Sequence, residues 1–263
     1  MAKPLWGTQQ MPGKEPVRFD FGSLQLWLKS TSDEFWITHR HVDIDRDGIR
    51  RGQTEALPDD TTWQRWTLKK PLDSIKLLPG FPDIPIVVKP EYPFHVTIGV
   101  KTRIYVRAPL SVRVVLGSVE IIKLPAIVLS KTWFGNFVDG ELCFWISSAA
   151  RKQIEPDPAR PYLAICPIEI INRSDDELLV DKICHRVRKL SLYSLNNQLW
   201  SNETRVKYRG ASKISEISFS KTAPPEAPKA ELISPSQDDA KKGFTAKTFD
   251  TLTDLTGLDF LRR

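Results

Sequence analysis

Side chains of alternating character run from His95 to Leu116, and this pattern limits the fold more than any other feature of the chain. Apolar side chains fall mainly on the even-numbered positions, which are expected to face a core because successive side chains of a strand point to opposite faces of a sheet. A helix would scatter the same residues around its circumference. The segment therefore predicts two consecutive strands, or one bent strand, with Pro109 at the break. The even-numbered set is Val96, Ile98, Val100, Thr102, Ile104, Val106, Ala108, Leu110, Val112, Val114 and Leu116.

Short turn motifs indicate that neighbouring strands pair antiparallel. Asp139-Gly140 separates FGNFV from ELCFWI, and Asn196-Asn197 separates LSLYSL from QLWSNETRVKY. Asp, Asn and Gly tolerate the positive φ angles that a two-residue hairpin turn requires. The chain is therefore predicted to be mainly β, with antiparallel sheets packed like a sandwich in one or two units, and an open barrel is the alternative.

Proline-rich stretches divide the chain into four predicted parts. An N-terminal β unit covers residues 1–81, and a β-sandwich core covers 82–221, with a break near 153–161. Residues 222–239 are rich in proline and polar side chains and are expected to form a tether. Apolar residues recur every three positions from Phe249 to Leu258, which predicts a short C-terminal helix within 240–263. That helix could dock on its own sandwich or bind a partner.

Composition narrows the class of protein and its compartment. The net charge is +6 over 263 residues, without the Lys/Arg stripe typical of nucleic-acid binding, so nucleic acid is an unlikely partner. Cys143, Cys166 and Cys184 fit no CxxC or zinc-finger spacing and lie in apolar strand-like stretches, which predicts buried, reduced thiols. No apolar leader and no run of 18 apolar residues stands in the sequence. The expectation is a cytoplasmic protein without a membrane span.

Metal-ligand residues gather between Thr38 and Gly48, in THRHVDIDRDG. The candidate ligands are His39, His41, Asp43, Asp45 and Asp47. His39, His41, Asp43 and Asp45 would share one face if the strand continues through them, and such a face could hold a divalent cation. The first six residues resemble the metallo-β-lactamase motif T-H-x-H-x-D-H, which implies a zinc-dependent hydrolase, but Ile44 replaces its last histidine.

A calcium loop is the second metal interpretation of this segment. Asp43, Asp45, Asp47 and Gly48 match the pattern D-x-D-x-D-G, but Thr54 stands where the loop needs a bidentate glutamate. The alternative to both metal interpretations is a strand with a solvated polar face that ends in an Asp-Gly turn. The sequence favours this third interpretation, so no cofactor is expected, and calcium is the alternative.

A second candidate site mixes aromatic and basic side chains. Trp63, Arg65 and Trp66 precede Lys69-Lys70, as a surface for carbohydrate or single-stranded nucleic acid would require. Packing in a core or at a sheet edge explains the same residues. No GxSxG, HExxH, Walker A or GxGxxG motif stands in the sequence, so enzymatic activity is left open and disfavoured.

Several long phrases of the sequence resemble one prokaryotic family. They are SKTWFGNFVDGELCFWISSAARKQ, CPIEIINRSDDELLVDKICHRVRKLSLYS, QLWSNETRVKYRG and the ending TAKTFDTLTDLTGL. Together they are similar to the family catalogued as domain of unknown function 432, from about Pro82 to Leu261. The resemblance implies a shared fold, no known activity or ligand, and an ending that belongs to the family's core domain.

The predicted function is that of a non-enzymatic binding or regulatory module that acts through a protein partner. Two alternatives remain from the residues. One is a metal-dependent protein or hydrolase that uses the His/Asp segment at 39–48. The other is a carbohydrate or nucleic-acid binder that uses Trp63, Arg65 and Trp66.

Overall fold

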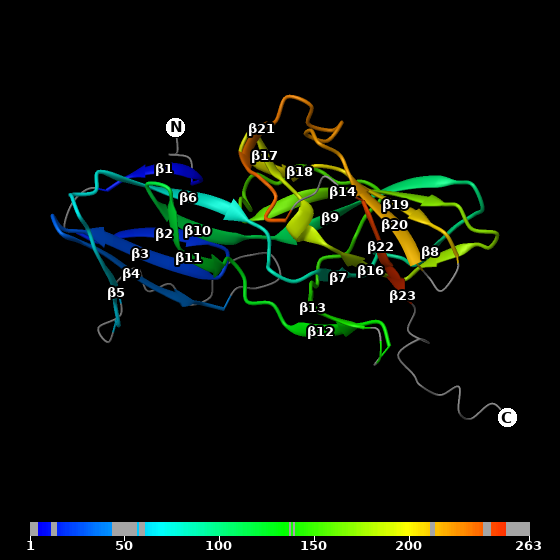
Figure 1. Ribbon diagram of the computed structural model, residues 1–263, viewed down its shortest axis with the longest axis horizontal. Coiled ribbons are helices and arrows are strands. Elements are labelled where there is room, and N and C mark those ends of the chain that lie inside the picture. The colour runs from blue at the N-terminus through cyan, green and yellow to red at the C-terminus, as the bar shows by residue number, and fades with distance from the viewer. Residues whose placement is uncertain are drawn as a thin grey trace. The chain divides into compact units, whose positions relative to one another are not determined.

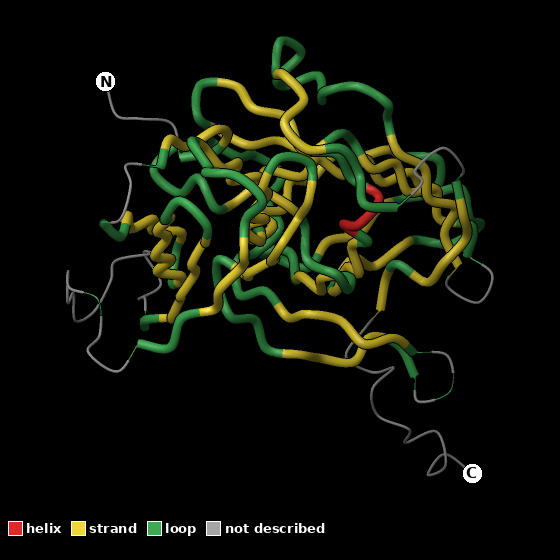
Figure 2. Tube along the Cα trace, turned by 60° about the vertical axis from the view of Figure 1, so that its left-hand side comes forward, coloured by secondary structure: helices red, strands yellow, loops and turns green. Residues whose placement is uncertain are grey.

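The structure is a computed structural model that describes residues 5–11, 15–43, 57, 61–136, 138, 140–210, 214–238 and 243–250. Chain contacts divide the protein into two compact units. Unit 1 comprises Met1–Gly80, Pro109–Val128 and Ala159–Tyr162, and unit 2 comprises Phe81–Ala108, Leu129–Pro158 and Leu163–Arg263. Strands dominate the described residues, and the one helix among them is the 3-10 helix η1 (Val187–Lys189), drawn in red in Figure 2. No helix in this part of the chain is long and apolar enough to cross a membrane.

The first sheet of unit 1 is an antiparallel meander. Its strands, in spatial order, are β2 (Val17–Phe21), β3 (Leu24–Ser30), β4 (Glu34–His41) and β5 (Gln64–Thr67). The turn between β2 and β3 contains Gly22 at φ +58°, and a Cβ there would lie 2.9 Å from the carbonyl oxygen of Ala126. Glycine is therefore required both by the backbone angle and by the close approach.

The second sheet of unit 1 has the spatial order β1 (Gly7–Gln10), β6 (Ser74–Gly80), β10 (Ser111–Leu116) and β11 (Val119–Pro125). Both sheets of unit 1 can be followed in Figure 1, and both contribute fully buried side chains to the core. Leu26, Leu28 and Phe35 come from the first sheet, and Leu77 and Val112 come from the second.

The eight-stranded sheet is the largest in unit 2. Its spatial order is β21 (Glu231–Ser234), β17 (Leu192–Leu195), β18 (Gln198–Ser201), β14 (Leu163–Asn172), β19 (Thr204–Tyr208), β20 (Ile214–Phe219) and β22 (Phe244–Lys247), and β9 (Lys101–Pro109) also pairs with β14. Most pairs are antiparallel, but β14 runs parallel to both β18 and β19. Two parallel neighbours need a long connection between them, and here that connection contains other strands of the chain.

Two smaller sheets complete unit 2. The five-stranded sheet has the order β12 (Lys131–Phe134), β13 (Glu141–Trp145), β7 (Ile86–Val88), β16 (Lys182–His185) and β23 (Phe249–Asp250). Its β13 and β7 are parallel, and its other pairs are antiparallel. The two-stranded sheet pairs β15 (Leu178–Val180) with β8 (Phe94–Val96).

The alternating segment 95–116 forms β9 and β10 with the break at Pro109, as its pattern predicts, but its first residues belong to a separate strand, β8. Ile104 and Val106 on its even-numbered face are buried. Ile98 and Val100 are exceptions, with exposed fractions of 57% and 45%. They lie in a turn that contains Gly99 at φ +75°, where the N–H of Val100 donates to the carbonyl of Thr97 at 3.1 Å. The alternating sequence pattern therefore runs through this turn, although the strand is interrupted there.

The two predicted hairpin turns differ in outcome. Asn196 and Asn197 have φ angles of 50° and 63° and join β17 to β18 with Leu195 opposite Gln198, so this two-residue turn is confirmed. The other turn is longer than predicted, because Phe134 pairs with Glu141 and the whole segment 135–140 connects β12 to β13. Asp139 itself lies outside the described residues.

The C-terminal parts of the chain depart from the sequence-based expectation. The segment 222–239, predicted as a tether, contains β21 and buries Ala227 completely. Within the predicted helix 240–263, residues 244–247 and 249–250 form β22 and β23 instead, and residues 251–263 lie outside the described part. The free edges of β20 and β16 offer backbone pairing, and Phe249 is buried there. At Phe249, pairing and burial outweigh the weak three-residue periodicity. The other residues of that pattern, Leu252, Leu255 and Leu258, lie outside the described part of the chain.

Candidate functional site

His39 and His41 lie at the end of β4, on the same face as the fully buried Phe35 and Ile37. Nδ1 of His41 lies 3.0 Å from Oγ of Ser23, and that hydroxyl donates to the carbonyl of Ala126 at 3.1 Å. Since the serine has one hydroxyl hydrogen, the pattern assigns the proton of neutral His41 to Nδ1. Burial lowers the pKa of both histidines, and for His41 the charge of protonated His39 lowers it further.

His39, His41 and Asp43 lie at alternate positions of the chain, but their ligand atoms do not converge on one point. The imidazole centroids lie 6.3 Å apart at an interplanar angle of 83°. Asp43 is exposed, and within the described residues these three side chains form no group with all ligand atoms inside 4.8 Å. Asp45 and Asp47 lie outside the described part of the chain. The half-buried histidines belong to the core-facing side of β4, not to a fully solvated face.

Trp63, Arg65 and Trp66 are divided between the two faces of their sheet. The Trp66 ring lies 6.4 Å from that of the buried Phe35, whereas Arg65 lies on the opposite face with its guanidinium 4.1 Å from the Trp36 ring. Nζ of Lys29 lies 4.2 Å from the Trp36 ring and 4.5 Å from the Trp63 ring. Cations from β3 and β5 thus contact Trp36 from both neighbouring strands, and a sugar or base would have to displace them.

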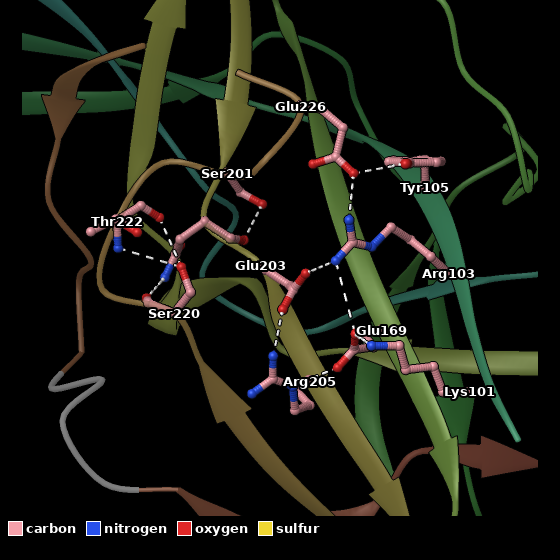
Figure 3. Close-up of polar contacts among 11 residues, drawn as sticks. Lys101, Arg103, Tyr105, Glu169, Ser201, Glu203, Arg205, Ser220, Thr222 and Glu226 are labelled. Atoms are coloured by element: carbon pink, nitrogen blue, oxygen red, sulfur yellow. Dashed lines mark hydrogen bonds and ion pairs between the residues drawn. The ribbon is translucent and has the colours of Figure 1, made fainter. Parts of the chain in front are cut away.

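A network of charged side chains covers part of the eight-stranded sheet (Figure 3). Glu169 on β14 and Glu203 are both buried. Arg205 donates from Nε to Glu169 at 2.6 Å and from Nη2 to Glu203 at 3.2 Å. Nζ of Lys101 lies 3.2 Å from Glu169, and Arg103 pairs with Glu203. Arg103 also lies 4.0 Å from Glu169, so Glu169 is compensated by three cations and Glu203 by two.

Glu226 joins this network from the segment that precedes β21. It accepts hydrogen bonds from Arg103 at 2.8 Å and from the hydroxyl of Tyr105 at 2.7 Å. Burial disfavours the charged form of Glu169, yet hydrogen bonds from Arg205 and Lys101 outweigh it and keep its pKa below the ordinary value. A general acid must retain its proton near neutral pH, so the ionised Glu169 is suited to holding strands together.

A cleft of about 280 Å³ lies elsewhere in unit 2, near the start of β8. Its lining combines Tyr92, Phe94 and Ile104 with Arg151 and Lys152. Arg151 forms an ion pair with Glu91 at 3.3 Å, and Nζ of Lys152 lies 5.0 Å from the Phe94 ring. Reasoning from the sequence missed this cleft, although the phrase PEYPF, with a tyrosine between two prolines, was an available signal.

Backbone hydrogen bonds fix the walls of the cleft. The N–H groups of Tyr105 and Arg151 donate to each other's carbonyls at 2.7 and 3.0 Å. The N–H of Ala150 donates to Lys89 at 2.8 Å, and the N–H of Glu91 donates to Ala150 at 2.9 Å. The residues that carry the cleft's side chains are therefore held in register before any ligand arrives.

The three cysteines are free and buried, as the sequence predicts. Sγ of Cys143 lies 3.9 Å from Sγ of Cys184, which in turn lies 3.5 Å from Oε1 of Glu141. Burial raises the pKa of the Cys184 thiol, and its hydrogen bond with Cys143 raises it further. Burial also raises the pKa of Cys166 to about 12, so that thiol is protonated at neutral pH.

Comparison with family models identifies a family that covers nearly the whole chain. Residues 5–254 match the model of the family described as "Protein of unknown function (DUF432)". The search of curated proteins and the search of solved structures each returned no match.

Proposed function

The chain belongs to this family of unknown function, and we propose that it is a non-enzymatic binding module that holds a segment of a protein partner in the cleft beside Tyr92. The exposed fraction of Tyr92 is 79%, which is large for an aromatic side chain without a ligand. Tyrosine is enriched where proteins meet, because it offers a rigid apolar ring and one polar group. Exposure of this ring at the mouth of a preformed cleft is the observation that carries the proposal.

The size of the cleft favours a side chain of a partner over a whole cofactor. Small-molecule pockets usually measure about 300–1,000 Å³. At about 280 Å³ the cleft lies just below that range and suits one or two side chains of a peptide. The bound segment would run over the surface, with its anchoring residue inserted.

The lining determines the chemistry of the partner. Ile104 and Phe94 provide an apolar floor, and Arg151 and Lys152 provide two positive charges against the single carboxylate of Glu91. The best occupant is therefore a large apolar side chain with an aspartate or glutamate next to it. The three free thiols support placing this function in the cytoplasm.

Selection from a random peptide library displayed on phage tests the proposal. With the full chain as bait, we expect enriched peptides to combine an aromatic or large aliphatic residue with an adjacent acid. A fluorescent copy of such a peptide should bind Tyr92→Ala or Lys152→Glu about tenfold more weakly than the parent, since anchor residues contribute on the order of 1–2 kcal/mol.

Two matched variants separate the cleft from the rest of the surface. Val119→Ala removes another exposed apolar side chain, and Lys69→Glu reverses another exposed lysine, both in unit 1. Neither should change the peptide's dissociation constant. The proposal fails if no sequence class is enriched, or if the selected peptides bind Tyr92→Ala as tightly as the parent.

A further inference from the structure

We propose that Glu141, Cys143 and Cys184 form a binding site for a divalent transition metal, and that zinc fits it best. Among the described residues, these three are the group of Cys, His, Asp and Glu side chains whose ligand atoms all lie within 4.8 Å of one another. The site lies in the five-stranded sheet of unit 2 and does not depend on the cleft beside Tyr92.

Strand geometry places the three side chains together. Glu141 and Cys143 are two residues apart on β13, so their side chains point to the same face of the sheet. Cys184 belongs to β16, and β7 lies between β13 and β16. Both cysteines are buried, whereas the side chain of Glu141 is 35% exposed.

The distances agree with a tetrahedral metal centre. At bond lengths of about 2.3 Å to sulfur and about 2.1 Å to oxygen, tetrahedral angles separate two thiolates by about 3.8 Å and a thiolate from a carboxylate oxygen by about 3.6 Å. The corresponding separations here are 3.9 Å between the two Sγ atoms and 3.5 Å between Sγ of Cys184 and Oε1 of Glu141. Both separations agree with the expected values to within the spread of such sites, about 0.2 Å. The ligand atoms of Glu141 and Cys143 lie within 4.8 Å of one another.

A disulfide between Cys143 and Cys184 does not suit the same geometry. Neighbouring strands lie about 4.8 Å apart, so two strands on either side of β7 are separated by about twice that distance. The Cα atoms of a disulfide are at most about 6.8 Å apart. A metal ion spans the longer gap, because two metal–sulfur bonds take the place of one sulfur–sulfur bond.

The charge of Arg186 and the partial exposure of Glu141 both suit a bound metal ion. A metal dication bound by two thiolates and one carboxylate has one net negative charge, and the guanidinium of Arg186, which pairs with Glu141, offsets it. The partial exposure of Glu141 leaves a fourth position that water or a thiol from solution can reach. Two sulfur ligands select zinc over magnesium or calcium.

Cobalt titration of the full chain, freed of metal and kept reduced, tests the site directly. Cobalt(II) should produce sulfur-to-metal charge-transfer absorption and the intense visible bands of tetrahedral coordination, at one ion per chain. One equivalent of zinc should abolish both signals and raise the melting temperature. Cys184→Ser should eliminate the charge-transfer band, whereas Cys166→Ser, which removes a buried thiol in another sheet, should retain it.

A second variant keeps the test decisive if Cys184→Ser does not fold. Glu141→Gln preserves the size of a half-exposed side chain and should weaken zinc binding by at least about tenfold, as loss of a ligand does at comparable sites. The proposal is overturned if the folded parent gives no tetrahedral cobalt spectrum. It is equally overturned if Glu141→Gln binds zinc as tightly as the parent, or if the cobalt spectrum depends on Cys166.

Discussion

Glu169 keeps its charge inside the largest sheet because Arg205 and Lys101 compensate the loss of hydration. Burial alone would raise its pKa, but the hydrogen bonds from these two cations lower it below the ordinary value. A carboxylate whose pKa is lower in the folded than in the unfolded state stabilises the fold at pH values above the pKa of the unfolded state. For glutamate that pKa is about 4.3. That stabilisation is lost as the pH falls through the lower pKa of the folded state.

Replacing Glu169 with glutamine should therefore change the acid sensitivity of the protein. At pH 7 we expect the free energy of unfolding to fall by about 1–2 kcal/mol, less than for a fully buried ion pair because Arg205 and Lys101 are largely exposed. Between about pH 5 and 3, urea unfolding of the variant should depend less on pH than that of the parent. Glu231→Gln, at an exposed position on β21, serves as the control. If the free energy of unfolding of Glu169→Gln changed with pH as steeply as that of the parent, the ionised state assigned to this carboxylate would be contradicted.

Single residues also show where sequence reasoning about the site succeeds and where it stops. The positive φ angles of Asn196 and Asn197 follow from local preference and were predictable. The burial of Cys143 and Cys184 followed from their apolar neighbours. The proximity of the two sulfur atoms could not be predicted, because the cysteines are 41 residues apart in the sequence. Their strands come near each other only because both pair with β7.

At the scale of elements, a substitution in β23 can test the strand structure near the C-terminus, which the sequence did not predict. Phe249 is buried, pairs with Ile183 in the backbone register, and packs its ring 6.0 Å from that of Tyr208. Phe249→Ala should lower the free energy of unfolding by about 3–5 kcal/mol, the usual cost of removing a buried phenylalanine. Thermal or urea unfolding followed by circular dichroism measures the change.

A partly exposed residue of the eight-stranded sheet provides the comparison. Ile214 begins β20 and is 42% exposed, so Ile214→Ala should cost well under half as much as Phe249→Ala. Equal effects of the two substitutions would mean that Phe249 is not part of the core. They would favour the sequence-based alternative in which the residues after the predicted tether bind a partner.

The elements themselves were predicted best where the pattern is local. Alternation identified β9 and β10, because each strand has one buried face. It could not locate the turn at 97–100, where Ile98 and Val100 keep the pattern without the burial. Strands β21, β22 and β23 were missed because pairing with distant strand edges, rather than their own composition, determines their structure.

At the scale of the whole molecule, both units are built from separate stretches of chain. The sequence predicts an N-terminal β unit that ends at residue 81, and unit 1 does include residues 1–80. It also takes in residues 109–128 and 159–162. Local patterns indicate strands but not their distant partners, so the pairing of β6 with β10 was not visible in the sequence.

This pairing predicts that residues 1–81 do not fold as a fragment. Without β10 and β11, Ile75 and Leu77 on β6 lose the neighbouring strand that carries the buried Val112 and Val114. The N–H groups of Ser23 and Leu24 also lose the carbonyl of Ala126. We expect the fragment to give poorly dispersed amide signals in a two-dimensional nitrogen–proton NMR spectrum.

A redesigned fragment supplies the missing strands without the rest of the chain. Gly80 at the end of β6 lies opposite Ser111 at the start of β10 in an antiparallel pair, so a short Gly/Asn linker from residue 80 to residue 109 can close a hairpin there. This fusion of 1–80 with 109–128 should recover wide amide dispersion and a cooperative unfolding transition, because it restores the buried side of both sheets. If residues 1–81 alone give the dispersed spectrum, the N-terminal stretch is an independent domain and β10 is dispensable to it.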